Sequence, residues 1–214
     1  MKGQLLLIFV FITFGISSKE NNIGLEYSFN VEITNKAIAE KLKENPEFQF
    51  SKSFKVFYTE KGSLRFIEKS NNFIQSSIFN NKNNELILFD KTGIVSEKTG
   101  NYNKPEIKSE NSETDNTITY ETKTGTYNYY YNPEKLKFNS SNLNNLGEHC
   151  LNKFISETGV LPKKIVFEFG FMKFIVEMKR TINLSSKDVN SLNKIIAKPN
   201  KKGIKKFIEF CDGK

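Results

Sequence analysis

The segment from Lys163 to Ile182 places the strongest constraint on the fold, because apolar and charged residues alternate on either side of Gly170. One face of an extended strand would carry Ile165, Phe167, Phe169, Phe174, Val176 and Met178, and the other Lys164, Glu168, Glu177 and Lys179. This period of two, with aromatic and β-branched side chains, predicts an antiparallel hairpin that turns near Gly170.

Similar alternation recurs along the chain. It is strict from Leu25 to Ile33, and short strands separated by turn residues follow at 54–58, 64–68, 73–79, 85–89, 94–95, 117–122 and 127–131. Helical spacing occurs at 35–45, at 142–159 and after a Ser185–Asp188 capping box, while 204–211 fits a helical turn or an edge strand. We therefore predict an α+β fold, a curved antiparallel β-sheet of roughly eight to eleven strands with a few helices packed on one face. Residues 97–116 are predicted to form a polar loop.

Residues 1–18 have the pattern of a secretory signal peptide. Lys2 precedes an apolar run from Leu5 to Phe14, and small residues follow from Gly15 to Ser18. The run is shorter than the roughly 20 residues that a spanning helix needs. We expect an exported, periplasmic or secreted protein with a single domain at 19–214; an uncleaved N-terminal anchor is the alternative.

The two cysteines, Cys150 and Cys211, allow two interpretations. In an exported protein they could form a disulfide, which over so long a loop would contribute on the order of 4 kcal/mol. Two separate buried thiols are the alternative. Without a Cys-x-x-Cys motif, and with His149 as the single histidine, the sequence predicts neither a metal site nor a cofactor.

Catalytic residues are also not predicted. His149 is adjacent to Cys150, and neighbouring residues point in different directions on a helix or strand, so the pair is a poor dyad. The run from Tyr127 to Tyr131 could offer a stacking or carbohydrate-binding platform, although ordinary pairing within a sheet explains it as well. We therefore predict a protein that is not an enzyme.

Some predicted strands are apolar on both faces. Phe57 lies between Val56 and Tyr58, and residues 86–89 are apolar at every position. Such strands need cover on both sides, so helices would cover one face while the other lines a cavity, a partner surface or the far wall of a curved sheet. The candidate ligand-binding residues are Phe57, Ile87, Phe89, Val166 and Ile175.

Basic residues gather near the C-terminus, in a chain of formal net charge +8. The candidate basic surface consists of Lys198, Lys201, Lys202, Lys205 and Lys206. It could touch an anionic membrane surface or simply be a solvated cationic end. Nucleic acid is not an expected partner of an exported chain without a recognition motif.

Several motifs resemble a group of exported bacterial domains of unknown function, the GLPGLI-type proteins and their relatives. They are Gly24–Phe29, Asn45–Phe48, Leu86–Gly93, and Thr158–Pro162 ahead of a hairpin with Gly170–Lys173 at its turn. The Gly-Leu-Pro-Gly-Leu-Ile motif itself is absent. The resemblance implies a LolA-like half-barrel, the fold of a lipoprotein carrier. We therefore expect an apolar ligand or lipid in the concave face of the sheet, or alternatively an envelope protein partner on the same apolar face.

Overall fold

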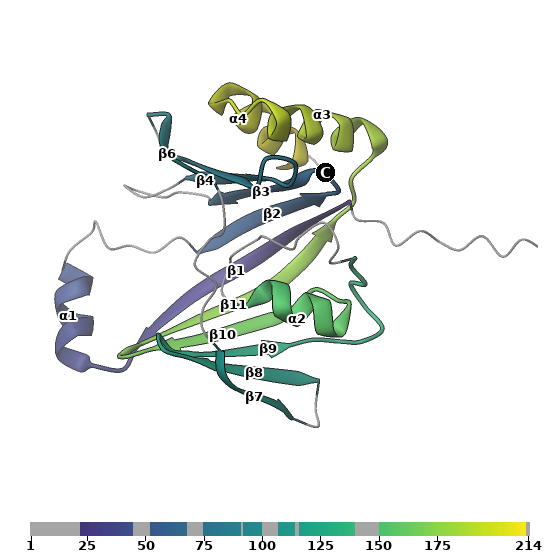
Figure 1. The fold of residues 1–214 in the computed structure, drawn as a ribbon. Helices are drawn as coiled ribbons and strands as arrows, with labels where there is room; N and C mark the ends of the chain where they lie inside the picture. The colour runs from purple at the N-terminus through teal and green to yellow at the C-terminus, as the bar shows by residue number, and fades with distance from the viewer. Residues whose placement is uncertain are drawn as a thin grey trace, which may run out of the picture.

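The computed structural model describes residues 22–44, 52–67, 75–90, 92–99, 107–113, 116–139 and 150–212. They contain one antiparallel sheet in the order β6-β5-β4-β3-β2-β1-β11-β10-β9-β8-β7 (Figure 1). The strands are β1 Ile23–Ile33, β2 Ser53–Thr59, β3 Gly62–Ile67, β4 Ser76–Asn80, β5 Glu85–Phe89, β6 Ile94–Thr99, β7 Ile107–Glu113, β8 Thr117–Thr122, β9 Thr126–Tyr130, β10 Lys164–Phe169 and β11 Met172–Ile182. The helices are α1 Lys36–Glu44, α2 Leu151–Thr158, α3 Ser186–Ala197 and α4 Lys201–Asp212.

The centre of the sheet joins distant parts of the chain. β1 pairs with β11 from Gly24 opposite Ile182 to Ile33 opposite Met172. All the other neighbours in the sheet are consecutive strands of the chain. Two meanders, β2–β6 and β7–β10, therefore flank this central pair. Figure 1 shows the sheet bending along β1 and β11, with the two meanders on either side of the bend.

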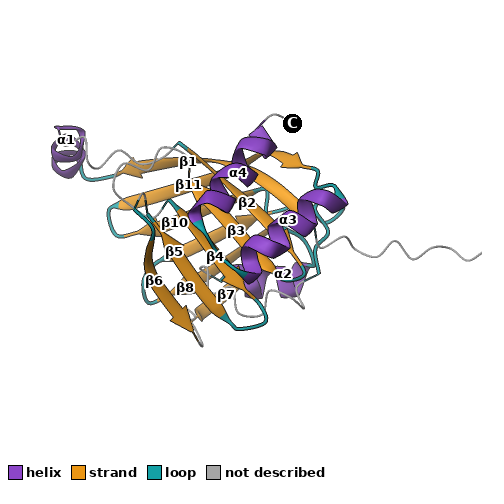
Figure 2. Cartoon of the chain, turned by 90° about the horizontal axis from the view of Figure 1, so that it is seen from above, coloured by secondary structure: helices purple, strands orange, loops and turns teal. Residues whose placement is uncertain are grey.

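Each face of the sheet has its own apolar cluster. On one face, Phe57, Leu64 and Ile78 pack against α3 and α4, which cross the sheet over β2 to β4 (Figure 2). On the other face, one cluster joins Phe79 of β4 to Ile118 of β8 and includes residues of α2. Because this second cluster draws side chains from both meanders, its face is the inside of the bend.

The predicted fold class, an α+β curved antiparallel sheet with helices packed on one face, is confirmed, and α2 adds a helix on the other face. The hairpin expected at 163–182 is β10 and β11, and the alternation at 25–33 is β1. The capping box that begins α3 is present, since the Ser185 hydroxyl accepts from the Asp188 amide and the Asp188 carboxylate accepts from the Ser185 amide.

Two predicted segments differ. The prediction of a polar loop at 97–116 is wrong in part, because β6 continues to Thr99 and β7 pairs with β8 from Ile107 to Glu113. The segment 204–211, left between a helical turn and an edge strand, belongs to the full helix α4, which buries Ile204, Phe207 and Ile208. The predicted signal peptide at 1–18 lies outside the described residues. Among the described helices, none has the length and apolar character needed to cross a membrane.

Candidate functional site

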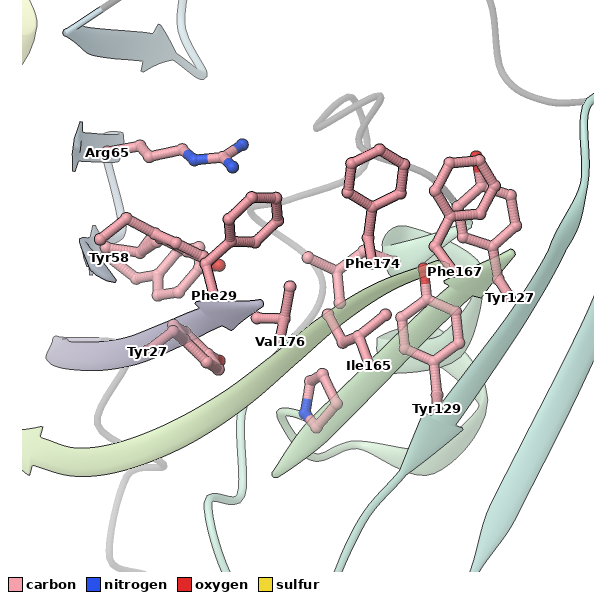
Figure 3. Close-up of a pocket in the computed structure, with 14 residues that line it drawn as sticks. Tyr27, Phe29, Tyr58, Arg65, Tyr127, Tyr129, Ile165, Phe167, Phe174 and Val176 are labelled. Carbon is pink, nitrogen blue, oxygen red and sulfur yellow. The ribbon is translucent and has the colours of Figure 1, made fainter. Parts of the chain in front are cut away.

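A pocket of about 290 Å³ opens on the inner face of the bend (Figure 3). Strands β1, β2, β3, β9, β10 and β11 contribute to it together with α2, so both meanders supply walls. The described residues that line it are Tyr27, Phe29, Phe54, Val56, Tyr58, Arg65, Tyr127, Tyr129, Leu151, Pro162, Ile165, Phe167, Phe174 and Val176. Apart from Arg65, these residues are apolar or aromatic, which suits an apolar ligand.

Aromatic rings form a continuous wall of the pocket across β9, β10 and β11. Phe167 is directly opposite Tyr127 on one side and Phe174 on the other, and the ring centroids lie 4.1 Å and 5.8 Å apart. Phe29 of β1 extends the wall by stacking on Phe174 at 5.9 Å. Alternate residues of a strand share a face, so the alternation in the sequence is what brings these rings together. Burial raises the pKa of Tyr127, which keeps its phenol uncharged.

Helix α2 closes one side of the pocket. Leu151 lines it directly, and the fully buried Phe154 stacks on Tyr129 with ring centroids 4.9 Å apart. The helix ends at Gly159, which adopts the left-handed conformation (φ 66°) and whose amide donates to the Ile155 carbonyl. Gly159 is therefore the C-terminal cap of α2.

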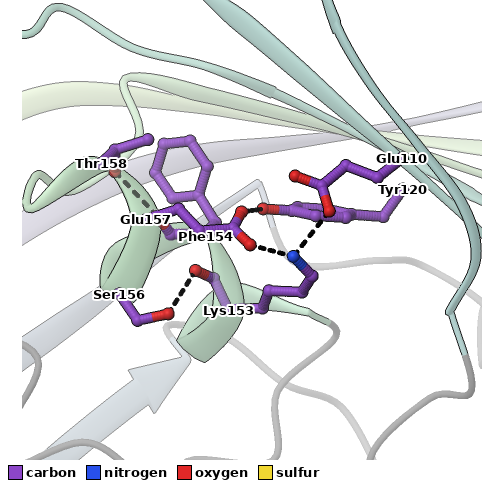
Figure 4. A network of polar contacts seen from close by, with 7 residues as sticks. All are labelled: Glu110, Tyr120, Lys153, Phe154, Ser156, Glu157 and Thr158. Carbon is purple, nitrogen blue, oxygen red and sulfur yellow. Dashed lines mark hydrogen bonds and ion pairs between the residues drawn. The ribbon is translucent and has the colours of Figure 1, made fainter.

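A polar cluster holds α2 against β7 and β8 (Figure 4). The Lys153 ammonium lies 2.6 Å from a Glu110 carboxylate oxygen and forms a second ion pair with Glu157. The Tyr120 hydroxyl donates to Glu157 at 2.5 Å. Burial raises the pKa of Tyr120 above its ordinary value of 10.0, which further favours the protonated hydroxyl that donates this hydrogen bond. These contacts explain the cluster as a structural attachment of the helix that carries Leu151 and Phe154.

The five candidate ligand-binding residues do not line this pocket. Phe57, Ile87 and Phe89 are buried under α3 and α4, where Phe57 meets Phe207 edge to face at 5.1 Å. Val166 and Ile175 are opposite one another, between neighbours whose side chains do line the pocket, and therefore lie on the outer face. The prediction that strands such as β2 are covered on both faces is correct, but Phe57, Ile87 and Phe89 lie on the face that the helices cover and not on the face that holds the pocket.

Sequence reasoning missed the pocket residues because their alternation looked like an ordinary core pattern. The run from Tyr127 to Tyr131 lies in the paired strand β9 up to Tyr130, and two of its rings, Tyr127 and Tyr129, reach the pocket. Arg65 gave no signal in the sequence. Its neighbours Leu64 and Phe66 belong to the helix-covered face, and this leaves Arg65 on the inner face.

The cysteines take the second of the two predicted alternatives. Cys150 is buried in the inner cluster and Cys211 in the outer one, so the sheet separates them and the disulfide prediction is wrong. Burial raises the pKa of Cys150 to about 11, which keeps it a protonated, unreactive thiol. His149 lies outside the described residues.

The five lysines of the candidate basic surface are all exposed, on α4 and the residue that follows α3. A groove between the two helices carries Lys187, Lys194 and Lys206 beside Phe210, whose side chain is 50% exposed. The described residues contain no group of three or more His, Cys, Asp or Glu side chains placed to hold a metal ion.

No protein-family model matches the sequence, and a search of curated proteins also finds no match. Among solved structures, the crystal structure of LprF from Mycobacterium bovis is similar, with a TM-score of 0.25 and 8% sequence identity over 78% of this chain and 89% of that chain. So slight a likeness carries no argument about function. Membership of the GLPGLI-type group stays a prediction.

Proposed function

We propose that this protein binds an apolar ligand, such as a lipid acyl chain, in the aromatic pocket on the inner face of its sheet. The observation that supports this proposal is the pocket lining, in which thirteen of fourteen described residues are apolar or aromatic. Its volume of about 290 Å³ lies just below the usual range of ligand pockets, which is roughly 300–1,000 Å³. A single chain or a small ring system therefore suits it better than a bulky lipid.

Filling the pocket tests this function. Val176→Trp places an indole where the ligand would lie, and each buried methylene that is displaced costs a ligand about 0.8 kcal/mol. We expect at least about a tenfold loss of affinity for the uncharged fluorescent probe N-phenyl-1-naphthylamine. Fluorescence titration measures the affinity, and circular dichroism verifies folding.

Ile175→Trp is the matched control, because it introduces the same ring at the next residue of β11, on the outer face. It should leave probe binding unchanged. A wild-type protein that is folded but does not bind the probe contradicts the proposed function. Loss of binding in Ile175→Trp but not in Val176→Trp would instead move the site to the face that holds Phe57 and Ile87.

A protein partner is the second candidate function, and exposed aromatics favour it. Phe169 and Phe171, at the turn between β10 and β11, are 43% and 38% exposed. If the probe does not bind, a stoichiometric complex with an envelope protein that is lost in the Phe169→Ser/Phe171→Ser variant would support this alternative. In either case we propose that the protein is exported and is not an enzyme. Detection of the mature chain in the cytoplasm would contradict export.

We further propose that α4 touches an anionic membrane surface. Juxtamembrane lysines each add to such attraction, and Lys202 and Lys206 are exposed on α4. Lys202→Gln/Lys206→Gln should lower co-sedimentation with phosphatidylglycerol vesicles about tenfold at low salt. Lys36→Gln/Lys41→Gln, which removes the same charge from α1, should have little effect. Equal binding to phosphatidylcholine vesicles would contradict a charge-driven contact.

A further inference from the structure

Arg65 is the charged side chain among the described residues that line the pocket. It lies on β3 directly opposite Val56, another lining residue, and is half-buried. Figure 3 shows its guanidinium extending from the strand across the pocket, toward the side where Phe29 and Phe174 stand. The pocket therefore has an aromatic interior with one cationic side.

The Phe54 ring fixes the direction of this cation. The central carbon of the guanidinium lies 4.6 Å from the Phe54 ring centroid, a cation–π contact. Pairing with a carboxylate or phosphate uses the edge of the group, where the N–H donors form a planar fork. The contact with Phe54 holds the guanidinium at this side of the pocket, within reach of a ligand in the pocket.

A positive charge beside apolar walls has a consequence for ligand choice. In such surroundings a charge-assisted hydrogen bond is stronger than in water. A ligand that places only hydrocarbon against the cation removes water from the guanidinium and forms no hydrogen bond in its place. Acidic side chains are absent from the described lining residues, so Arg65 is the charged group that these residues present to a ligand. An anionic ligand head accordingly complements the charge of this pocket.

We propose that Arg65 binds the anionic head, a carboxylate or a phosphate, of an amphiphile whose apolar chain lies in the aromatic pocket. This inference rests on the proposed function and narrows its ligand class. The protein then discriminates between amphiphiles of equal chain length by the charge of the head.

Competition with N-phenyl-1-naphthylamine tests the selectivity at a pH where the acids are ionised. Dodecanoate, dodecyl phosphate and dodecanol have the same alkyl length and differ in the head. We expect at least one of the two anions to bind about tenfold or more tightly than dodecanol to the wild-type protein. Arg65→Met, which keeps an unbranched side chain without the charge, should abolish the preference, and Arg65→Lys should retain part of it.

Lys173→Met is the matched control, because it removes a charge from β11 next to Phe174 but on the outer face, and it should keep the preference. Equal binding of all three amphiphiles to the wild-type protein overturns the role of Arg65 while leaving the apolar site intact, and needs no variant to be folded. Absence of probe binding overturns both proposals. Which anion binds more tightly separates a fatty-acid carboxylate from a phosphate head.

Discussion

Gly62→Ala is expected to lose more than about 3 kcal/mol of the free energy of unfolding, a large part of what a domain of this size possesses. Gly62 begins β3 with φ 149°, a conformation that L-residues rarely adopt. A Cβ built on it would lie 1.9 Å from the backbone carbonyl oxygen of Phe79 on the neighbouring strand β4. Because backbone cannot move aside as a side chain can, β3 and β4 would have to separate. Chemical denaturation measures the loss, or the variant fails to accumulate as folded protein.

Gly93→Ala separates the two contributions in this prediction. Gly93 has nearly the same backbone angle, φ 157°, but its Cβ would meet nothing within 4 Å among the described residues. Gly93→Ala should therefore lose only the free energy that the unfavourable backbone conformation costs, of order 1 kcal/mol. Similar losses in the two variants would show that close approach of β4 is not what requires Gly62.

Phe154→Ala is expected to cost about 3–5 kcal/mol of unfolding free energy, the usual range for an aromatic side chain removed from a core. The ring is fully buried and contacts both Tyr129 and Tyr131. Since Tyr129 lines the pocket, its loss of support should also weaken binding of N-phenyl-1-naphthylamine. Urea denaturation and probe titration measure the two effects.

Phe171→Ala serves as the control for Phe154→Ala, because it removes the same atoms from an exposed turn. Its unfolding free energy should stay within about 0.5 kcal/mol of the wild-type value. If the loss in Phe154→Ala were as small as that in Phe171→Ala, the Phe154 ring would contribute little to the core. Unchanged probe binding in a destabilised but folded Phe154→Ala protein would show that Tyr129 keeps its position without the Phe154 ring.

Much of the fold could be predicted because local rules decide it. Alternation fixed β1 and the β10–β11 hairpin, and the Ser185 capping box marked the start of α3. The strand β7 could not be found in this way, because its sequence, IKSENSE, has no apolar residue after Ile107. It sits at one end of the strand order and exists through pairing with β8, a tertiary contact that no local pattern encodes.

The site was harder to predict than the fold, for a geometric reason. Alternation shows that Phe57 and Val56 face opposite ways, but not which face receives helices. That choice depends on where α3 and α4 pack, and α4 was not recognised as a full helix. The pocket also needs Phe29 of β1 beside Phe174 of β11, a contact between residues far apart in the chain.

The pairing of β1 with β11 determines the order in which this chain can fold. The Ser28 hydroxyl donates to the Glu177 carbonyl across 149 positions of sequence, so nearly the whole chain must be available before the two strands meet. Within β2–β6 and within β7–β9 the paired strands follow one another directly in the chain, so they can form earlier. We therefore expect a slow final step in which the two preformed halves close along β1 and β11. The aromatic pocket would come into existence only at that step, and a truncated chain lacking β11 would retain hairpins but no binding site.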